Sequence, residues 1–239
     1  ARAGASTALG AQCFVVVVTQ GRFGFGPTRL LGGLAFSLGL VLVVVGGAEL
    51  FTGNNLLTMA WASGHVSTTA LLRSWVVVYA GNLAGAIATA AIVFGTGVWK
   101  LGDGAVGATL VEIATAKTSL GFGEALLRGM LCNALVCLAV WLCFSARSTT
   151  DKILSILLPI SAFVACGYEH SVANMYLIPL GLAVQGPLGM GRDGLTWGAF
   201  LWRNLLPVTA GNVIGGAGMV AAVYWFVYLR PRGSPASRP

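Results

Sequence analysis

Charged side chains are scarce in this sequence, and their scarcity argues against a soluble fold. Only 9% of the 239 residues are Asp, Glu, Lys or Arg, whereas soluble domains carry about 25%. Hydrophobic residues make up 56% of the chain, and the mean hydropathy is +0.84. A water-soluble protein of this length needs more polar surface around its core. We therefore expect an all-α protein embedded in a lipid bilayer.

Clusters of charge, of metal ligands and of catalytic groups are also missing. The 14 Lys and Arg residues stand singly between apolar runs, so they suit lipid headgroups better than nucleic acid. The five cysteines lie in apolar stretches without a CxxC pair, and only two histidines are present. These counts predict no disulfide, metal site or bis-histidine haem. No nucleophile with a base and an orienting group can be assembled, so we expect no cofactor and no enzyme.

Long apolar runs dominate what is present. A bilayer span needs about 20 such residues, and six candidate segments cover 4–20, 30–61, 74–98, 125–145, 153–184 and 199–229. The second and fifth segments are too long for one straight crossing and carry polar residues inside them. Polar groups and irregular backbone at membrane depth are tolerated where they face a cavity. We therefore predict that these two segments are broken helices.

Two sequence patterns occur once in each half of the chain. The pattern G-x-E-x4-N spans residues 47–54 and 167–174, and R-x7-G-N-x-x-G spans residues 73–85 and 203–215. Glycines four residues apart in the second pattern allow helices to pack closely. Recurrence of both patterns in the same order predicts two structural repeats. Each repeat holds three spans, so the second must enter the membrane inverted.

The repeats define the predicted domain. They cover about 4–98 and 125–229 of a single transmembrane channel domain, 1–229, and a polar tail at 230–239 is predicted to be disordered. Inverted repeats with paired broken helices place a transport site where the breaks meet. We therefore expect a pathway between Thr52 of the first break and His170 of the second.

The polar residues at the breaks divide into pathway and structural candidates. An ionisable group inside a membrane usually marks a pathway, so His170 is the leading functional candidate, with Thr52 offering a hydroxyl from the opposite repeat. A histidine can donate a hydrogen bond to a passing weak-acid anion, which suits an anion pore. A buried carboxylate would repel that anion, so we interpret the acids as structural acceptors for backbone N–H groups at the breaks. The asparagines of the repeated patterns are expected to hold the broken segments. These structural residues are Glu49, Glu169, Asn54, Asn174, Asn82 and Asn212.

Four stretches resemble the formate/nitrite transporter family. They are GGLAFSLGLVLVVVGGAELFTGN at 32–54, NALVCLAVW at 133–141, DKILSILLPISAFVACGYEHSVANMY at 151–176 and VTAGNVIGG at 208–216. The resemblance extends over nearly the whole chain. It implies a homopentamer of aquaporin-like protomers in a bacterial inner membrane, with both termini cytoplasmic. It also implies that formate, nitrite or hydrosulfide passes through each protomer, with short monocarboxylates other than formate as further substrates.

The resemblance also implies roles for individual residues. His170 matches the central pore histidine, Thr52 its partner, Asn133 a pore asparagine and Lys117 a lysine that attracts anions. The matches to the outer constriction are Phe36, Leu40 and Phe163, and those to the inner constriction are Leu50, Phe51 and Val136.

These inferences combine into one mechanism and leave alternatives open. An anion that enters an apolar constriction loses water at a cost of several kcal/mol. A proton donated near His170 would let the neutral acid cross instead. A neutral-solute pore of the water or glycerol type is the first alternative, although paired NPA motifs are missing. An intramembrane enzyme or a respiratory anchor subunit is the second. The sequence leaves the order of preference among formate, nitrite and hydrosulfide open. It also leaves open whether transport is channel-like or coupled to protons.

Overall fold

The computed structural model describes residues 1–230, so positions 231–239 of the predicted tail lie outside the described residues. Within them the chain is helical and forms no strand. In chain order the elements are α1 (Arg2–Val18), α2 (Phe25–Val45), η1 (Gly53–Leu56), α3 (Leu57–Ala62), α4 (Thr68–Thr96), η2 (Val98–Lys100), α5 (Ala105–Thr118), α6 (Phe122–Ser145), α7 (Thr149–Ala165), α8 (Ser171–Gln185), η3 (Ala199–Leu205), α9 (Leu206–Val213), η4 (Ile214–Ala222) and η5 (Trp225–Leu229). The last four run on as one helical stretch, in which η3, η4 and η5 are π-helical.

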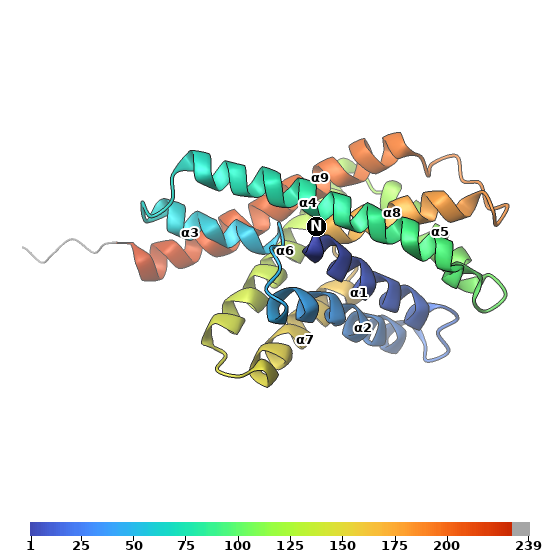
Figure 1. Ribbon diagram of the computed structural model, residues 1–239, viewed down its shortest axis with the longest axis horizontal. Helices are drawn as coiled ribbons and strands as arrows, with labels where there is room; N and C mark the ends of the chain where they lie inside the picture. Colours follow the sequence, from blue (N-terminus) through green and yellow to red (C-terminus); the bar gives the residue numbers. More distant parts are fainter. Residues whose placement is uncertain (231–239) are drawn as a thin grey trace, which may run out of the picture.

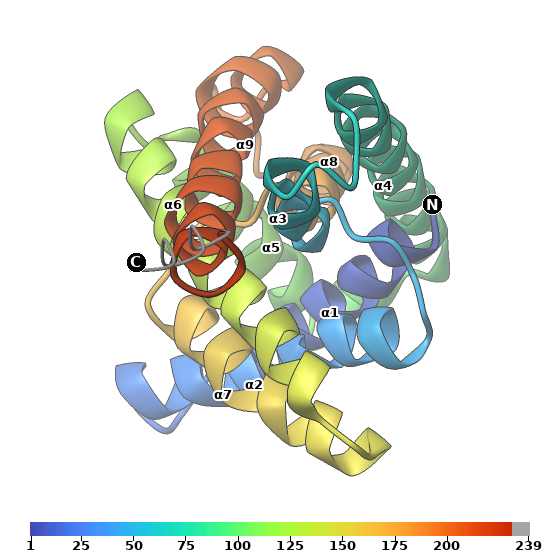
Figure 2. The same cartoon turned by 90° about the vertical axis from the view of Figure 1, so that its left-hand side faces the viewer.

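Four helical stretches are long and apolar enough to cross a bilayer. They are α2, α4, α6 and the stretch Ala199–Leu229, whereas α1 and α8 are shorter apolar helices. The helices run mostly along the long axis of the molecule (Figure 1). Viewed along that axis, the short helix α3 and the helix α8 lie near the centre, with α1, α4, α6 and α9 around them (Figure 2).

Both predicted helix breaks are present. The helix α2 ends at Val45 and the chain resumes helical structure at Gly53, while α7 ends at Ala165 and α8 begins at Ser171. Each break contains a glycine in the left-handed region, Gly47 at φ +64° and Gly167 at φ +73°. Residues with a Cβ rarely adopt this conformation, so these glycines let the chain leave the helix direction.

The helix α5 was not predicted. Its 14 residues include Glu112 and Lys117 and lie between the predicted segments 74–98 and 125–145. A helix of this length cannot cross the bilayer, which needs about 20 residues, so a search for long apolar runs passes over it. It packs against α8 and thereby carries Lys117 to the second break.

The glycines of the repeated pattern lie where helices touch. A Cβ on Gly85 of α4 would lie 2.0 Å from the Ala1 carbonyl oxygen, and one on Gly215 of η4 would lie 2.1 Å from that of Met130. No L side chain fits at these distances from a neighbouring backbone. The predicted close packing is therefore confirmed, between α4 and the start of α1 and between η4 and α6.

Substituting one of these glycines should destabilise the helix packing. We expect Gly215→Ala to lower the free energy of unfolding by at least about 1–3 kcal/mol, the usual cost of overpacking, because the Met130 carbonyl is backbone and cannot rotate away. The control is Gly218→Ala in the same stretch, where a Cβ meets open space. Thermal unfolding in detergent should show a lower midpoint for Gly215→Ala alone. Equal midpoints would contradict the close contact.

Candidate functional site

Thr52 and His170 meet where the two breaks come together. The Thr52 Oγ1 atom lies 3.0 Å from His170 Nε2, and both residues are buried. His170 is also the N-cap of α8, because its Nδ1 atom accepts a hydrogen bond of 3.1 Å from the Ala173 N–H. A neutral imidazole donates from only one nitrogen. These partners therefore assign the proton to Nε2, which donates to Thr52 and leaves the Thr52 hydroxyl hydrogen for another acceptor.

Two asparagines hold the breaks in matching ways. The Asn82 side chain accepts from the Phe51 N–H at 2.9 Å and donates to the Glu49 carbonyl at 3.1 Å. The Asn212 side chain accepts from the Ser171 N–H at 2.9 Å and donates to the Glu169 carbonyl at 3.0 Å. Each amide thus replaces the backbone partners that an interrupted helix loses.

The two glutamates at the breaks differ in burial. Glu169 is 3% exposed. Its Oε1 atom lies 2.8 Å from Lys117 Nζ, and its Oε2 atom accepts from Asn174 Nδ2 at 2.7 Å and Asn204 Nδ2 at 3.3 Å. Glu49 is exposed, and its carboxylate accepts from Asn54 Nδ2 at 2.5 Å.

This finding corrects the expectation for both acids. We predicted two buried carboxylates that accept from backbone N–H groups, but the partners are side chains and Glu49 is not buried. The physical reason lies in the asparagines. Because Asn82 and Asn212 already bond the backbone N–H groups at the breaks, the carboxylates turn to other donors.

Three cavities adjoin the breaks. The one we call the outer cavity has a volume of about 310 Å³ and is lined by His170 together with four charged residues. These charged residues are Arg29, Lys117, Arg128 and Glu169. It is therefore cationic, with three basic groups against one acid.

The central cavity has a volume of only about 10 Å³, close to that of a single water-sized probe. Two of its lining residues, His170 and Thr7, are polar or ionisable, and the rest of the wall is apolar. The apolar residues are Phe36, Leu40, Leu50, Val136, Ile160 and Phe163. A hydrated anion does not fit this space, so passage requires loss of water and movement of side chains.

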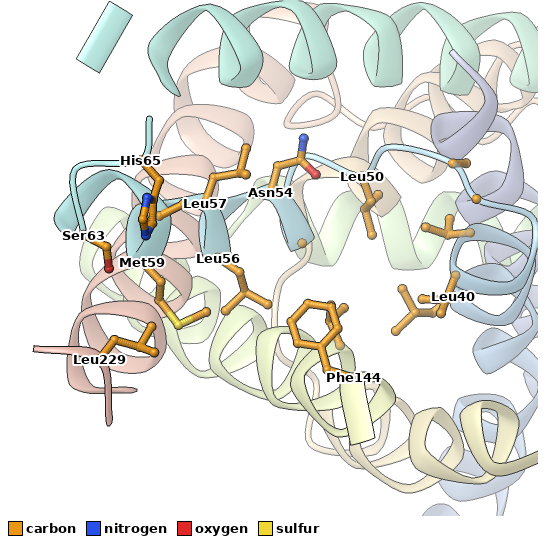
Figure 3. A pocket seen from close by; sticks show the side chains of 17 residues that line it. Leu40, Leu50, Asn54, Leu56, Leu57, Met59, Ser63, His65, Phe144 and Leu229 are labelled. Carbon is orange, nitrogen blue, oxygen red and sulfur yellow. The ribbon is translucent and has the colours of Figure 1, made fainter. Parts of the chain in front are cut away.

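The inner cavity has a volume of about 560 Å³ and a largely apolar wall. His65 and Ser63 lie at one end of it, and Leu40 lies at the opposite end (Figure 3). The central cavity shares Leu40 and Leu50 with the inner cavity, and it shares Phe36, Phe163 and His170 with the outer one. The three cavities therefore follow one another as a single route with His170 beside its narrowest part.

Five of the six predicted constriction residues line the cavities. The Phe36 and Phe163 rings meet edge to face, with centroids 5.5 Å apart, between the outer and central cavities. Leu40, predicted beside them, lines the central cavity together with both rings and also lines the inner cavity with Leu50. Val136 lines the central cavity itself.

Three predicted residues lie behind the route and line none of the three cavities. The Phe51 ring packs against Tyr79, with centroids 4.8 Å apart. The Asn133 amide donates to Asn55 Oδ1 at 2.7 Å and to the Asn212 carbonyl at 2.6 Å. Thr52 is 0% exposed and reaches the route through its contact with His170.

Sequence reasoning missed four residues of this region: Thr7, Arg29, Arg128 and Asn204. Thr7 and Arg29 belong to helices α1 and α2 and carry no motif that distinguishes them. The repeated pattern could have indicated Asn204. Asn204 directly follows Arg203, just as the polar residue Ser74 directly follows Arg73 in the first copy of the pattern. Asn54 Nδ2 lies 3.4 Å from Ser74 Oγ, and Asn174 Nδ2 lies 2.7 Å from Asn204 Oδ1.

Comparisons with known proteins agree on one family. The family profile described as formate/nitrite transporter matches residues 1–226. The chain is 40% identical to the formate channel FocA of Escherichia coli strain K12, over 91% of this chain and 81% of that protein. It is 38% identical to a probable formate transporter of Methanothermobacter thermautotrophicus, over 95% of this chain and 86% of that protein.

Solved structures agree with the sequence relatives. The fold matches a structure described as a pentameric formate channel with formate bound, with a TM-score of 0.88 and 40% identity over 95% of this chain and 94% of that one. It also matches an FNT family ion channel, with a TM-score of 0.84 and 32% identity over 95% of this chain and 87% of that one.

Proposed function

This chain belongs to the formate/nitrite transporter family, and from that premise we propose that it is a membrane channel for formate. The observation that carries the proposal is the route of three cavities, which narrows at His170 between Phe36 and Phe163 on one side and Leu40 and Leu50 on the other. Nitrite and hydrosulfide are further proposed substrates, because they too are small monovalent anions of weak acids.

The proposed mechanism follows the order of the cavities. The cationic outer cavity raises the local anion concentration, and Lys117 lines this cavity in its ion pair with Glu169. At the Phe36–Phe163 neck the anion loses water, at a cost of several kcal/mol. The Nε2–H group of His170 then offers the anion a hydrogen bond, and an anion that takes up a proton from water beside His170 crosses the apolar central cavity as a neutral acid. When no anion is present, the Nε2–H group of His170 donates its hydrogen bond to the Thr52 hydroxyl instead.

We propose supporting roles for the residues around the neck. Leu40, Leu50 and Val136 form the inner apolar seal, and Phe51 and Asn133 support it from behind. The asparagine and glutamate contacts stabilise the two breaks as loops. Without such hydrogen-bond partners, irregular backbone would not be tolerated inside a bilayer.

We further propose the architecture around the route. Residues 1–229 form one channel domain in which two inverted repeats supply six spans, and five copies assemble into a pentamer that catalyses no reaction. Large apolar side chains exposed on the outside, among them Val76 at 68%, Ile92 at 67% and Leu158 at 74%, support burial against lipid or a neighbouring copy. The protein lies in a bacterial inner membrane, and both of its termini face the cytoplasm.

Uptake into liposomes tests the substrate. We expect purified protein to speed entry of labelled formate, and nitrite and hydrosulfide to compete, because all three must cross the same neck. Glycerol should enter no faster than into empty liposomes, since the apolar central cavity offers few hydrogen bonds to a neutral polyol. Glycerol entry without formate entry would overturn the proposal in favour of a neutral-solute pore.

A further inference from the structure

Arg29 projects from α2 to the end of α7 and lines the outer cavity. Its Nη2 atom donates to the Val164 carbonyl at 2.7 Å, and its Nε atom donates to the Ala165 carbonyl at 3.2 Å. A cation is stabilised at a helix C-terminus, so the guanidinium is held in a fixed place. A guanidinium carries more N–H donors than these two bonds use, and the others remain for a ligand.

Arg128 reaches the same place from α6. Its Nη1 atom donates to the Gly167 carbonyl at 3.2 Å. A Cβ on Gly167 would lie 3.1 Å from Arg29 Nη2 and 3.7 Å from Arg128 Nη1. The two guanidinium groups therefore flank one glycine whose missing side chain leaves them room. Both arginines line the outer cavity directly ahead of the Phe36–Phe163 neck.

The charges of the outer cavity are unequal in their pairing. The Lys117 ammonium lies 2.8 Å from the Glu169 carboxylate, which is 4% exposed, so this lysine is largely neutralised within the protein. Arg128 pairs with Glu124 at the rim, where the two side chains are 40% and 50% exposed and water screens the pair. Arg29 pairs with no carboxylate among residues 1–230. The uncompensated positive charge therefore belongs to Arg29.

We propose that Arg29, assisted by Arg128, forms an oxyanion-binding site in the outer cavity that collects the substrate before the neck. The inference rests on the proposed function and names the site at which the anion first binds. Its ligand is a small planar anion with two oxygen acceptors, because a guanidinium matches such a pair with two parallel N–H groups. Formate and nitrite have this shape, whereas hydrosulfide does not.

Three variants test the site in liposomes. Arg29→Gln removes the charge, Arg29→Lys keeps the charge without the fork, and Arg22→Gln removes a charge from the exposed loop ahead of α2, outside the outer-cavity lining. Uptake of formate and hydrosulfide is measured at about 0.01 M and about 0.5 M ionic strength, because screening lengths fall from about 30 Å at 0.01 M to about 3 Å at 1 M. Thermal unfolding of each variant reports whether the α7 contact is lost.

The expected pattern separates charge from fork. Arg29→Gln should lower uptake of both anions at least about threefold at low salt, and by less at high salt. Arg29→Lys should keep hydrosulfide uptake but raise the half-saturating formate concentration several-fold. Arg22→Gln should match the wild type. If Arg29→Lys binds formate as the wild type does, or if Arg29→Gln keeps the wild-type salt dependence, the site is overturned. Absence of anion uptake by the wild type would instead overturn the proposed function.

Discussion

Glu169→Ala should lower the free energy of unfolding by about 3–5 kcal/mol, the usual cost of leaving a buried charge without its partner. The substitution removes the carboxylate 2.8 Å from Lys117 Nζ and also the acceptor of the Asn174 and Asn204 amides. Glu169 and the two amides are buried and the Lys117 side chain is 16% exposed, so water replaces the lost contacts poorly. Thermal or denaturant unfolding in detergent measures the change.

Two further variants decide whether the ion pair is the cause. Glu124→Ala removes the Arg128–Glu124 salt bridge, whose side chains are 40% and 50% exposed, and should cost only about 0–1 kcal/mol. A double variant, Lys117→Met with Glu169→Leu, removes both charges and should recover most of the lost stability, since apolar replacements of a buried pair are often neutral. Equal losses for Glu169→Ala and Glu124→Ala would contradict this account.

His170→Phe should reduce formate uptake by about 10- to 100-fold, because a hydrogen bond to a charged group contributes about 1.5–3 kcal/mol and each 1.4 kcal/mol is about tenfold. The phenyl ring fills the same space but carries no N–H group, so the anion meets an entirely apolar wall apart from Thr7. The pH dependence of uptake should disappear together with the rate. Uptake is measured in liposomes at several pH values.

The loss of rate must be separated from loss of fold, because His170 also caps α8. His170→Asn keeps a good N-cap residue, so it should unfold near the wild-type temperature and yet conduct poorly. His65→Phe, at the exposed end of the inner cavity, serves as the control for removing a histidine and should conduct within about twofold of the wild type. Wild-type uptake and pH dependence in His170→Phe would sink the proposed role.

Much of the fold followed from local sequence rules. The breaks at residues 46–52 and 166–170 were predicted, because polar residues within long apolar runs force irregular backbone toward a cavity. The α5 helix escaped prediction, since its length is set by packing against α8 and not by the thickness of the bilayer. The exposure of Glu49 was not predicted either. Burial depends on which neighbouring helices cover a break, and the sequence pattern that Glu49 shares with Glu169 carries no information about those helices.

The site was only partly accessible from the sequence. The pairing of His170 with Thr52 was expected from the repeated breaks, and the 3.0 Å contact agrees with it. Thr7, Arg29 and Arg128 carry no pattern and enter the route only because α1, α2 and α6 happen to converge there. Such long-range meetings are decided by tertiary packing, which residue spacing along one helix does not encode.

Plugging the central cavity tests the route most directly. Val136→Trp places a large ring in a space of about 10 Å³, and Leu131→Trp, on the exposed face of the same helix α6, is the matched control. Labelled formate uptake should fall to the level of empty liposomes for Val136→Trp and stay at the wild-type rate for Leu131→Trp, with both variants folded. Wild-type uptake by a folded Val136→Trp would mean that formate crosses the membrane elsewhere.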